Sequence, residues 1–329
     1  TEFELASDFV CKLSSRKSAK TMSDNVTVID PLYVHVLAST KTYLAVFVGM
    51  TFVFSLAGNS LVVLVHAKIA VKTVTHWMIF YIAICDVLSV LTGPLFICQM
   101  LEYSVHGFPD IVCRLQYLNS NSASVAAYLF CACTAVERYC MVVVSKDIFS
   151  IRVAKHMWIV IFLTAYGVGA INIWAIHSNM NGHCTFNYDL RYLVVIQYLS
   201  VFMIAFVCSI VMIVCYVRIG VYVLRTMQEL VQSNKTDRFQ KSYRDTIQMT
   251  KMLAIVAFVF LISVNVPYIT QVYAMANTPT TEPEKSFVVG LNTIYCVNTF
   301  FNPFLYMGLS STFRQRSIAL VSVCFGLRV

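Results

Sequence analysis

The chain has 329 residues, of which 58% are hydrophobic and only 12% are charged, and its formal net charge is +8. A soluble globular domain carries about 25% charged residues, so this composition excludes an ordinary water-soluble fold and favours a membrane protein. The sequence has no metal-ligand spacing of His and Cys, no nucleophile motif and no phosphate-binding glycine loop. We therefore expect no enzymatic activity, and no cofactor beyond the ion considered below.

Seven stretches of the chain are almost free of Asp, Glu, Lys and Arg, and each is long enough to cross a bilayer, which takes roughly 20 apolar residues. They cover residues 42–65, 77–101, 113–136, 157–177, 192–217, 252–281 and 286–312. The sixth should end near Met275, because Asn277-Thr278-Pro279 is typical of a turn. The sequence therefore predicts an all-α membrane protein with seven transmembrane helices.

The basic residues predict the orientation, because Lys and Arg concentrate in cytoplasmic loops. With the amino end outside, sixteen of them fall in the inner segments, whereas the outer loops hold only Arg114, Arg191 and Lys285. The net charge is then explained by inner loops that face lipid headgroups rather than by a nucleic-acid surface. We expect a multi-pass plasma-membrane protein with an extracellular amino terminus.

Three sites are open to covalent modification. On the outer side, Asn25-Val26-Thr27 is a glycosylation sequon. Cys113 opens the third stretch and Cys184 lies in the loop after the fourth, so both face an oxidising medium and we expect a disulfide between them. Cys11 is a further cysteine on the outer side, and Cys98 is a distant candidate for a disulfide with it. On the inner side, Cys324 follows a basic amphipathic segment, a position typical of palmitoylation; an unmodified cysteine at a frayed helix end is the alternative.

A carboxylate in the second stretch carries functional information. Asp86 lies in mid-span, where a charged side chain costs on the order of 3 kcal/mol, so it should face the helix bundle rather than lipid. Four uncharged polar residues are expected near the same depth: Asn59, Asn298, Thr299 and Asn302. The group is either a hydrogen-bonded packing cluster or a hydrated switch or ion site.

Motifs in all seven stretches together resemble one family. They are Gly58-Asn59, Ile82-Ala83-x-x-Asp86, Glu137-Arg138-Tyr139, Trp158, Tyr216-x-x-Ile219, Pro267 and Asn302-Pro303-x-x-Tyr306. In this order the chain resembles the rhodopsin-like (class A) G-protein-coupled receptors over residues 43–325, and within them the peptide-receptor branch. Cys113 also has the family's spacing from Arg138, and Phe313-Arg314 stands where the family's short eighth helix begins.

The resemblance implies a domain organisation and a set of roles. An extracellular tail (1–42) should precede the seven-helix bundle (43–309), followed by an amphipathic helix and a short cytoplasmic tail (310–329). The resemblance assigns G-protein coupling to Glu137, Arg138, Tyr139, Tyr216 and Tyr306. It assigns the activation core to Asn59, Asp86, Asn265, Pro267, Asn298, Asn302 and Pro303. Arg138 would pair with Glu137 at rest and turn toward a G protein on activation; simple snorkelling of the arginine to the membrane edge is the alternative.

Several residues depart from the family pattern. Asn265 replaces the tryptophan of helix six, Cys208 replaces the proline of helix five, and Tyr128 and Leu261 occupy the neighbouring core positions. We expect Asn265 to hydrogen-bond toward Ser124, or through water toward Asp86 and Asn298, or else to the backbone that Pro267 frees. Ala127 stands where a serine commonly helps to bind sodium, so any Na⁺ site at Asp86 should be weakened.

The ligand class is narrowed by exclusion. Aminergic receptors need a carboxylate where this chain has Ser120, and opsins need a lysine where it has Cys296. The outer loops carry five acidic and three basic residues, which fits a neutral or mildly basic peptide. Candidate ligand-binding residues in the outer halves of the spans are Gln99, Ser120, Ser124, Ser200, Asn265, Tyr268, Gln271 and Asn292. A membrane-lipid environment and a heterotrimeric G protein are the other expected partners, and no nucleic acid is expected.

Two other functions compete with a signalling receptor. A non-signalling decoy or scavenger receptor of the same fold would tolerate the altered helix six. A transporter or channel is disfavoured, because the two halves show no internal repeat and only one acid lies in mid-membrane.

Overall fold

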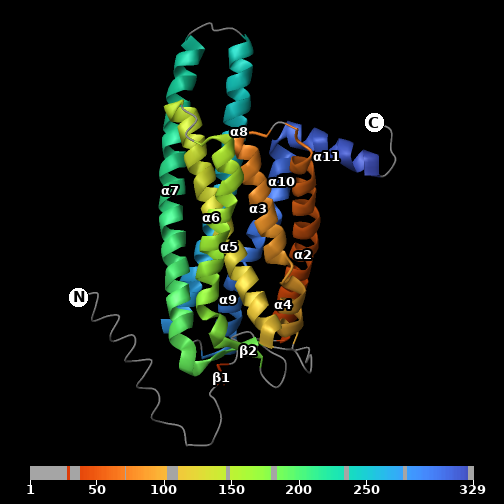
Figure 1. Ribbon diagram of the computed structural model, residues 1–329, viewed down its shortest axis with the longest axis vertical. Helices are drawn as coiled ribbons and strands as arrows, with labels where there is room; N and C mark the ends of the chain where they lie inside the picture. Colours follow the sequence, from red (N-terminus) through yellow and green to blue (C-terminus); the bar gives the residue numbers. More distant parts are fainter. Residues whose placement is uncertain are drawn as a thin grey trace, which may run out of the picture.

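The computed structural model describes residues 28–29, 38–70, 72–101, 110–145, 149–178, 184–232, 237–276 and 280–324. Its helices run side by side in an elongated bundle (Figure 1). The helices are α2 (Ala38–Ala67), α3 (Val74–Val90), α4 (Gly93–Met100), α5 (Asp110–Tyr139), α6 (Ile151–Gly169), α7 (Arg191–Gln232), α8 (Asp237–Ala276), α9 (Glu282–Asn292), α10 (Tyr295–Leu309) and α11 (Ser311–Cys324). A π-helical turn, Cys140–Val144, continues α5, and a 3-10 turn, Ala170–Ala175, continues α6.

Six helices among the described residues are long and apolar enough to cross a membrane. They are Ser39–Ala67, Val74–Cys98, Asp110–Val144, Ile151–Ala175, Tyr192–Thr226 and Ile247–Thr270. The seventh predicted span is formed by α9 and α10, which follow each other along the bundle and pack against α8 and α2. The all-α membrane fold expected from the sequence is confirmed, and α8 ends at Ala276, close to the predicted stop.

Two of the predicted spans are interrupted. The second breaks at Leu91 and Thr92, because Pro94 has no N–H to donate to the carbonyl one turn earlier. The seventh breaks at Thr293 and Ile294, where Ile294 N–H donates to Leu291 O and Cys296 N–H to Thr293 O, the shorter bonds of a tightened turn. The second span, Val74–Cys98, and the seventh therefore each contain a break. The fourth span ends at Ala175, because a strand begins at Ile176.

The two ends of the bundle are different. At one end, β1 (Val28–Ile29), β2 (Ile176–Ser178) and β3 (Cys184–Asn187) form an antiparallel sheet in the order β1-β3-β2. The segment before α2 thereby pairs with the loop between α6 and α7, with Val28 opposite Asn187. We call this the sheet end. At the other end, the α11 end, α11 projects sideways from the bundle (Figure 1).

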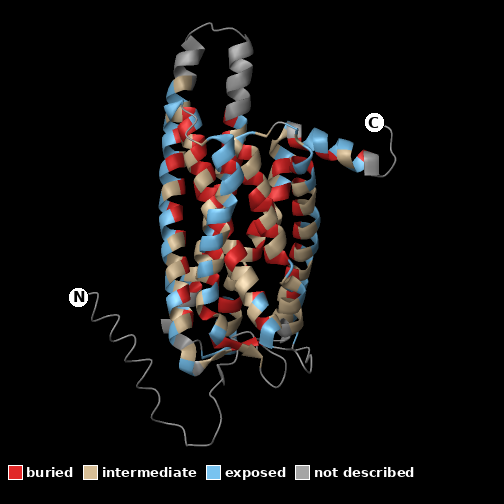
Figure 2. Ribbon diagram, viewed as in Figure 1, coloured by how far each residue is buried: buried red, intermediate tan, exposed pale blue. Residues whose placement is uncertain are grey.

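Burial follows the pattern expected in lipid. Buried residues face the interior of the bundle and exposed ones its outside (Figure 2). The exposed side chains of α7 include Leu199, Met203 and Phe206, which would be unfavourable in water but are suited to hydrocarbon. α5 is the central helix, since it packs against α3, α6, α7 and α8.

Candidate functional site

A disulfide joins the sheet to the central helix. Cys113, in the first turn of α5, is bonded to Cys184, the first residue of β3, as predicted. Both cysteines are fully buried, in a cluster with Ile176 that Tyr117 and Phe186 flank. Cys98 is a free thiol, and Cys11 lies outside the described residues. The loop between α6 and α7 is therefore held over the sheet end of α5.

An ion pair lies at the α11 end of the same helix. The Nε and Nη2 atoms of Arg138 donate to the two carboxylate oxygens of Glu137, each over 2.5 Å. The Thr75 hydroxyl of α3 accepts a hydrogen bond from Arg138 Nη2 and donates one to Glu137 Oε1 over 3.1 Å. Arg138 Nη1 also contacts Met249 Sδ of α8 at 3.8 Å.

The ion pair is almost fully removed from solvent, because only 6% of Arg138 and 5% of Glu137 is exposed. A snorkelling arginine would extend its guanidinium to the headgroups, whereas this one turns inward and is paired. Thr75 was not predicted from the sequence, because it lies two residues before the second predicted span and in the first turn of α3.

The three tyrosines assigned to coupling lie on α5, α7 and α10. Tyr306 is buried, and its ring meets that of Phe313 on α11 at 6.0 Å, edge to face. Its hydroxyl has no hydrogen-bond partner among the described residues. Tyr216 is half-buried and packs against the hydrophobic core of the bundle. Tyr139 is half-buried at the end of α5.

A polar cluster joins α2, α3 and α10 at mid-depth. Asn302 Nδ2 donates to the buried Asp86 carboxylate over 2.9 Å. Asn59 Nδ2 donates to the Thr299 carbonyl over 2.6 Å, and the Ser55 hydroxyl donates to the same carbonyl over 3.0 Å. Asp86 thus has the interior partner that its position required. Ser55, which was not predicted from the sequence, belongs to the cluster.

The helices of this cluster approach closely at a glycine. A Cβ atom on Gly58 would lie 2.7 Å from Cβ and Cγ of Pro303. A side chain at position 58 would therefore separate α2 from α10 and pull Asn59 away from Thr299.

The cluster has the chemistry of a weak site for a monovalent cation. The side-chain amide oxygens of Asn59, Asn298 and Asn302 are buried and have no hydrogen-bond partner within the described residues. Together with the Asp86 carboxylate they are the hard oxygen donors that Na⁺ takes, so the residues fit the ion. Ala127 is buried and supplies no hydroxyl. Within the described ranges, no three or more His, Cys, Asp and Glu side chains are grouped to hold a metal.

Asn265, on α8, forms hydrogen bonds with partners other than those expected from the sequence. Asn265 Nδ2 donates to the Ser209 hydroxyl of α7 over 3.2 Å and to the Leu261 carbonyl over 2.7 Å. Ser124 instead donates to the carbonyl of Ser120, on its own helix, over 2.9 Å. Both Pro267 and Pro303 lie inside helices, as predicted.

The candidate ligand-binding residues lie toward the sheet end. Ser124 and Ser200 both donate to carbonyls of their own helices, so their hydroxyls are partly satisfied without a ligand. Tyr268 and Ser120 are half-buried, and the side-chain oxygen of Asn292 is buried without a partner among the described residues. The side chains of Gln99 and Gln271 lie outside the described residues.

Comparison with known proteins identifies the class to which this fold and these sites belong. Residues 58–306 match the family of 7 transmembrane receptors (rhodopsin family). Squid rhodopsin shares the fold, with a TM-score of 0.71 over 92% of this chain and 93% of that one at 17% identity. The chain belongs to the rhodopsin family of seven-transmembrane receptors.

Three relatives show which members the chain is similar to. It is 24% identical to melanin-concentrating hormone receptor 2 of Macaca fascicularis over 90% of this chain and 85% of that one. It is 33% identical to human atypical chemokine receptor 4 over 37% of this chain and only 34% of that one. It is 33% identical to human growth hormone secretagogue receptor type 1 over 27% of this chain and 24% of that one.

Proposed function

We propose that this protein is a plasma-membrane receptor that binds an extracellular peptide and activates a heterotrimeric G protein. Membership of the rhodopsin family supports the receptor class. The peptide ligand is supported by the similarity to two proteins named as receptors for melanin-concentrating hormone and for growth hormone secretagogues.

The observation that carries the proposal is the continuous helix α5. Ser120 and Arg138 are 18 residues apart on it, which is about five turns or about 27 Å, so they share one face. One rigid element therefore runs from the candidate ligand residues to the buried Glu137–Arg138 pair. Movement of α8, which contacts Arg138 through Met249, would release the arginine for a G protein.

We assign the sheet end to the outside. Basic residues gather at the α11 end, where Lys68 follows α2, Arg152 lies in the first turn of α6 and Arg316 lies on α11, in accord with the positive-inside rule. The division into an outer tail (1–42), a bundle (43–309) and an inner segment (310–329) follows. Glycosylation of Asn25, which lies outside the described residues, and palmitoylation of Cys324, the last residue of α11, stay predictions.

Acidic groups at the sheet end favour a neutral or mildly basic peptide. Glu282 and Glu284 are exposed at the start of α9. The backbone N–H groups of Thr280 and Thr281 donate to Glu284, which holds the pKa of its carboxyl below the ordinary value. Glu284 therefore stays ionised at a pH where an ordinary glutamate begins to take up a proton.

A decoy or scavenger receptor is the second candidate function. It is favoured by the asparagine at position 265 and by partial similarity to proteins named atypical chemokine receptors 3 and 4. Such a receptor would bind its ligand and enter the cell without activating a G protein.

One screen separates the two functions. Cells that express the full chain are treated with a panel of secreted peptide hormones and chemokines, and G-protein dissociation and receptor internalisation are recorded in parallel. A peptide that gives both signals supports the proposal. A peptide that gives internalisation alone, across all G-protein families, would support the decoy function instead.

A further inference from the structure

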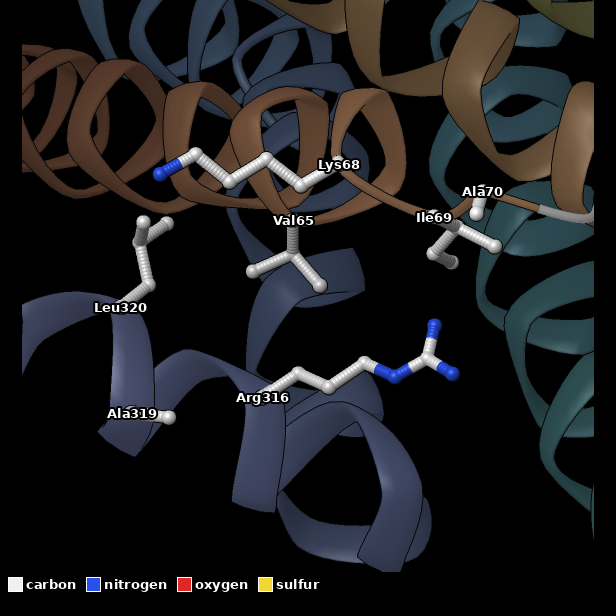
Figure 3. Close-up of a pocket in the computed structure, with 7 residues that line it drawn as sticks. All are labelled: Val65, Lys68, Ile69, Ala70, Arg316, Ala319 and Leu320. Atoms are coloured by element: carbon white, nitrogen blue, oxygen red, sulfur yellow. The ribbon is translucent and has the colours of Figure 1, made fainter.

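A groove opens between the end of α2 and the face of α11. Its volume is about 370 Å³, and Val65, Ile69, Ala319 and Leu320 form an apolar lining (Figure 3). Lys68 also lines it, from the α2 side, and Arg316 from the α11 side. None of the described residues that line the groove is acidic, so it combines an apolar floor with two positive charges.

The side chains of both basic residues of the groove are exposed and unpaired among the described residues. Neither the Lys68 ammonium nor the Arg316 guanidinium has a hydrogen bond or an ion pair with any part of the chain that the structure describes. Arg314, two residues away, differs in this respect, because its Nη1 donates to the carbonyls of Met307 and Gly308 at the end of α10. In Figure 3 the Lys68 ammonium and the Arg316 guanidinium lie toward opposite ends of the groove, with Val65 between them.

The groove lies where hydrocarbon gives way to headgroups. The last turn of α2 holds Leu64 and Val65 beside the buried His66, and Lys68 directly follows the last residue of the helix, Ala67. α11 projects sideways from the bundle at the level of this end of α2 (Figure 1). A lipid that entered from the side could place an acyl chain against Val65 and Leu320 and its headgroup beside the cations.

We propose that this groove is a binding site for a phosphoinositide, an anionic phospholipid whose headgroup carries a phosphomonoester in addition to the phosphodiester. Two separated cations match two separated anionic groups. Phosphatidylinositol would satisfy only one of them, and the ammonium of phosphatidylcholine would be repelled. The site requires only that the chain spans a membrane, so it does not depend on the proposed signalling function.

Native mass spectrometry of the purified full chain in detergent tests the site. Phosphatidylinositol 4-phosphate, phosphatidylinositol and phosphatidylcholine are added in turn, and the dissociation constant of each is measured. We expect the phosphorylated lipid to bind the wild-type chain more tightly than the other two. Lys68→Ala and Arg316→Ala should each weaken its binding roughly fivefold, and the double variant should bind it no better than phosphatidylcholine.

Arg152→Ala is the matched control, because it removes an exposed basic residue from the same end of the bundle outside the groove. It should leave binding of the phosphorylated lipid unchanged. Thermal midpoints without lipid should agree among all variants, since the substituted side chains are exposed. Equal affinity for the three lipids, or wild-type affinity in both Lys68→Ala and Arg316→Ala, would overturn the proposal. Loss of affinity in Arg152→Ala as large as in the groove variants would overturn it too.

Discussion

Asn265 on α8 and Ser209 on α7 are joined by a hydrogen bond of 3.2 Å from the amide nitrogen to the hydroxyl oxygen. The bond lies two residues before Pro267, the proline inside α8. A large aromatic side chain would fill this space in the resembled receptors, whereas here a polar contact connects the two helices. Because Arg138 is paired with Glu137 in the same structure, we expect the contact to belong to the resting arrangement.

Replacing Asn265 by Leu should raise basal G-protein activity. The substitution removes one interhelical hydrogen bond, which contributes about 1 kcal/mol, and it should shift the resting-to-active equilibrium about fivefold. Ser209→Ala removes the other partner and should act in the same direction. Basal signalling, divided by surface expression, is the measurement.

A double-mutant cycle and a control variant make this test specific to the Asn265–Ser209 bond. The Asn265→Leu, Ser209→Ala double variant should be no more active than the stronger single variant, because both remove the same bond. Thr270→Ala, which loses only a bond to the Val266 carbonyl of its own helix, should leave basal signalling unchanged. If Asn265→Leu lowers expression but not basal signalling, its role is structural.

Gly58→Ala should destabilise the bundle. The added methyl group would collide with the rigid ring of Pro303, and overpacking of this kind costs about 1–3 kcal/mol. Gly220→Ala on α7 is the matched control, since a Cβ there has no neighbour within 4 Å. Thermal unfolding in detergent should show a lower midpoint for Gly58→Ala alone, and an unchanged midpoint would mean that α2 and α10 can separate freely.

Cys113→Ser and Cys184→Ser should each reduce surface expression and ligand binding. Either change releases the loop between α6 and α7 from α5 and removes a bond of the kind whose loss costs about 2–5 kcal/mol. The double variant should be no worse than either single one. Cys98→Ser, at a free thiol, should be neutral in cell-surface labelling, and damage equal to that of Cys113→Ser would argue against the assigned pairing.

Ala127→Ser should increase the dependence of ligand binding on sodium. The added hydroxyl would supply the oxygen that the site at Asp86 lacks, while the wild-type chain should respond only weakly to exchange of Na⁺ for K⁺. Asp86→Asn in the Ala127→Ser background should remove the gain, because the carboxylate charge is lost. Radioligand binding in the two salts decides, and equal sodium dependence in wild type and Ala127→Ser would contradict the cation site.

Composition and periodicity predicted the helices well, because an apolar segment in lipid must satisfy its own backbone hydrogen bonds. They could not predict the break at Thr293, since no proline is adjacent and the turn depends on local hydrogen bonds. Pairing of Val28 with Asn187 joins segments 159 residues apart, which no local pattern reveals. The motifs indicated Arg138 and Asp86. They could not predict that Arg138 contacts Thr75 or that Asp86 contacts Asn302, because those contacts form only when α3 packs against α5 and α10.

The most direct test of the central claim is the agonist response of Arg138→Ala. The variant should bind the peptide found in the screen with unchanged affinity, because Arg138 lies at the end of α5 opposite to the ligand residues, and G-protein dissociation should be abolished. Arg114→Ala, at the other end of the same helix, should keep the maximal response when both are compared at equal surface expression. Full G-protein dissociation by Arg138→Ala would contradict the assignment of coupling to the Glu137–Arg138 pair.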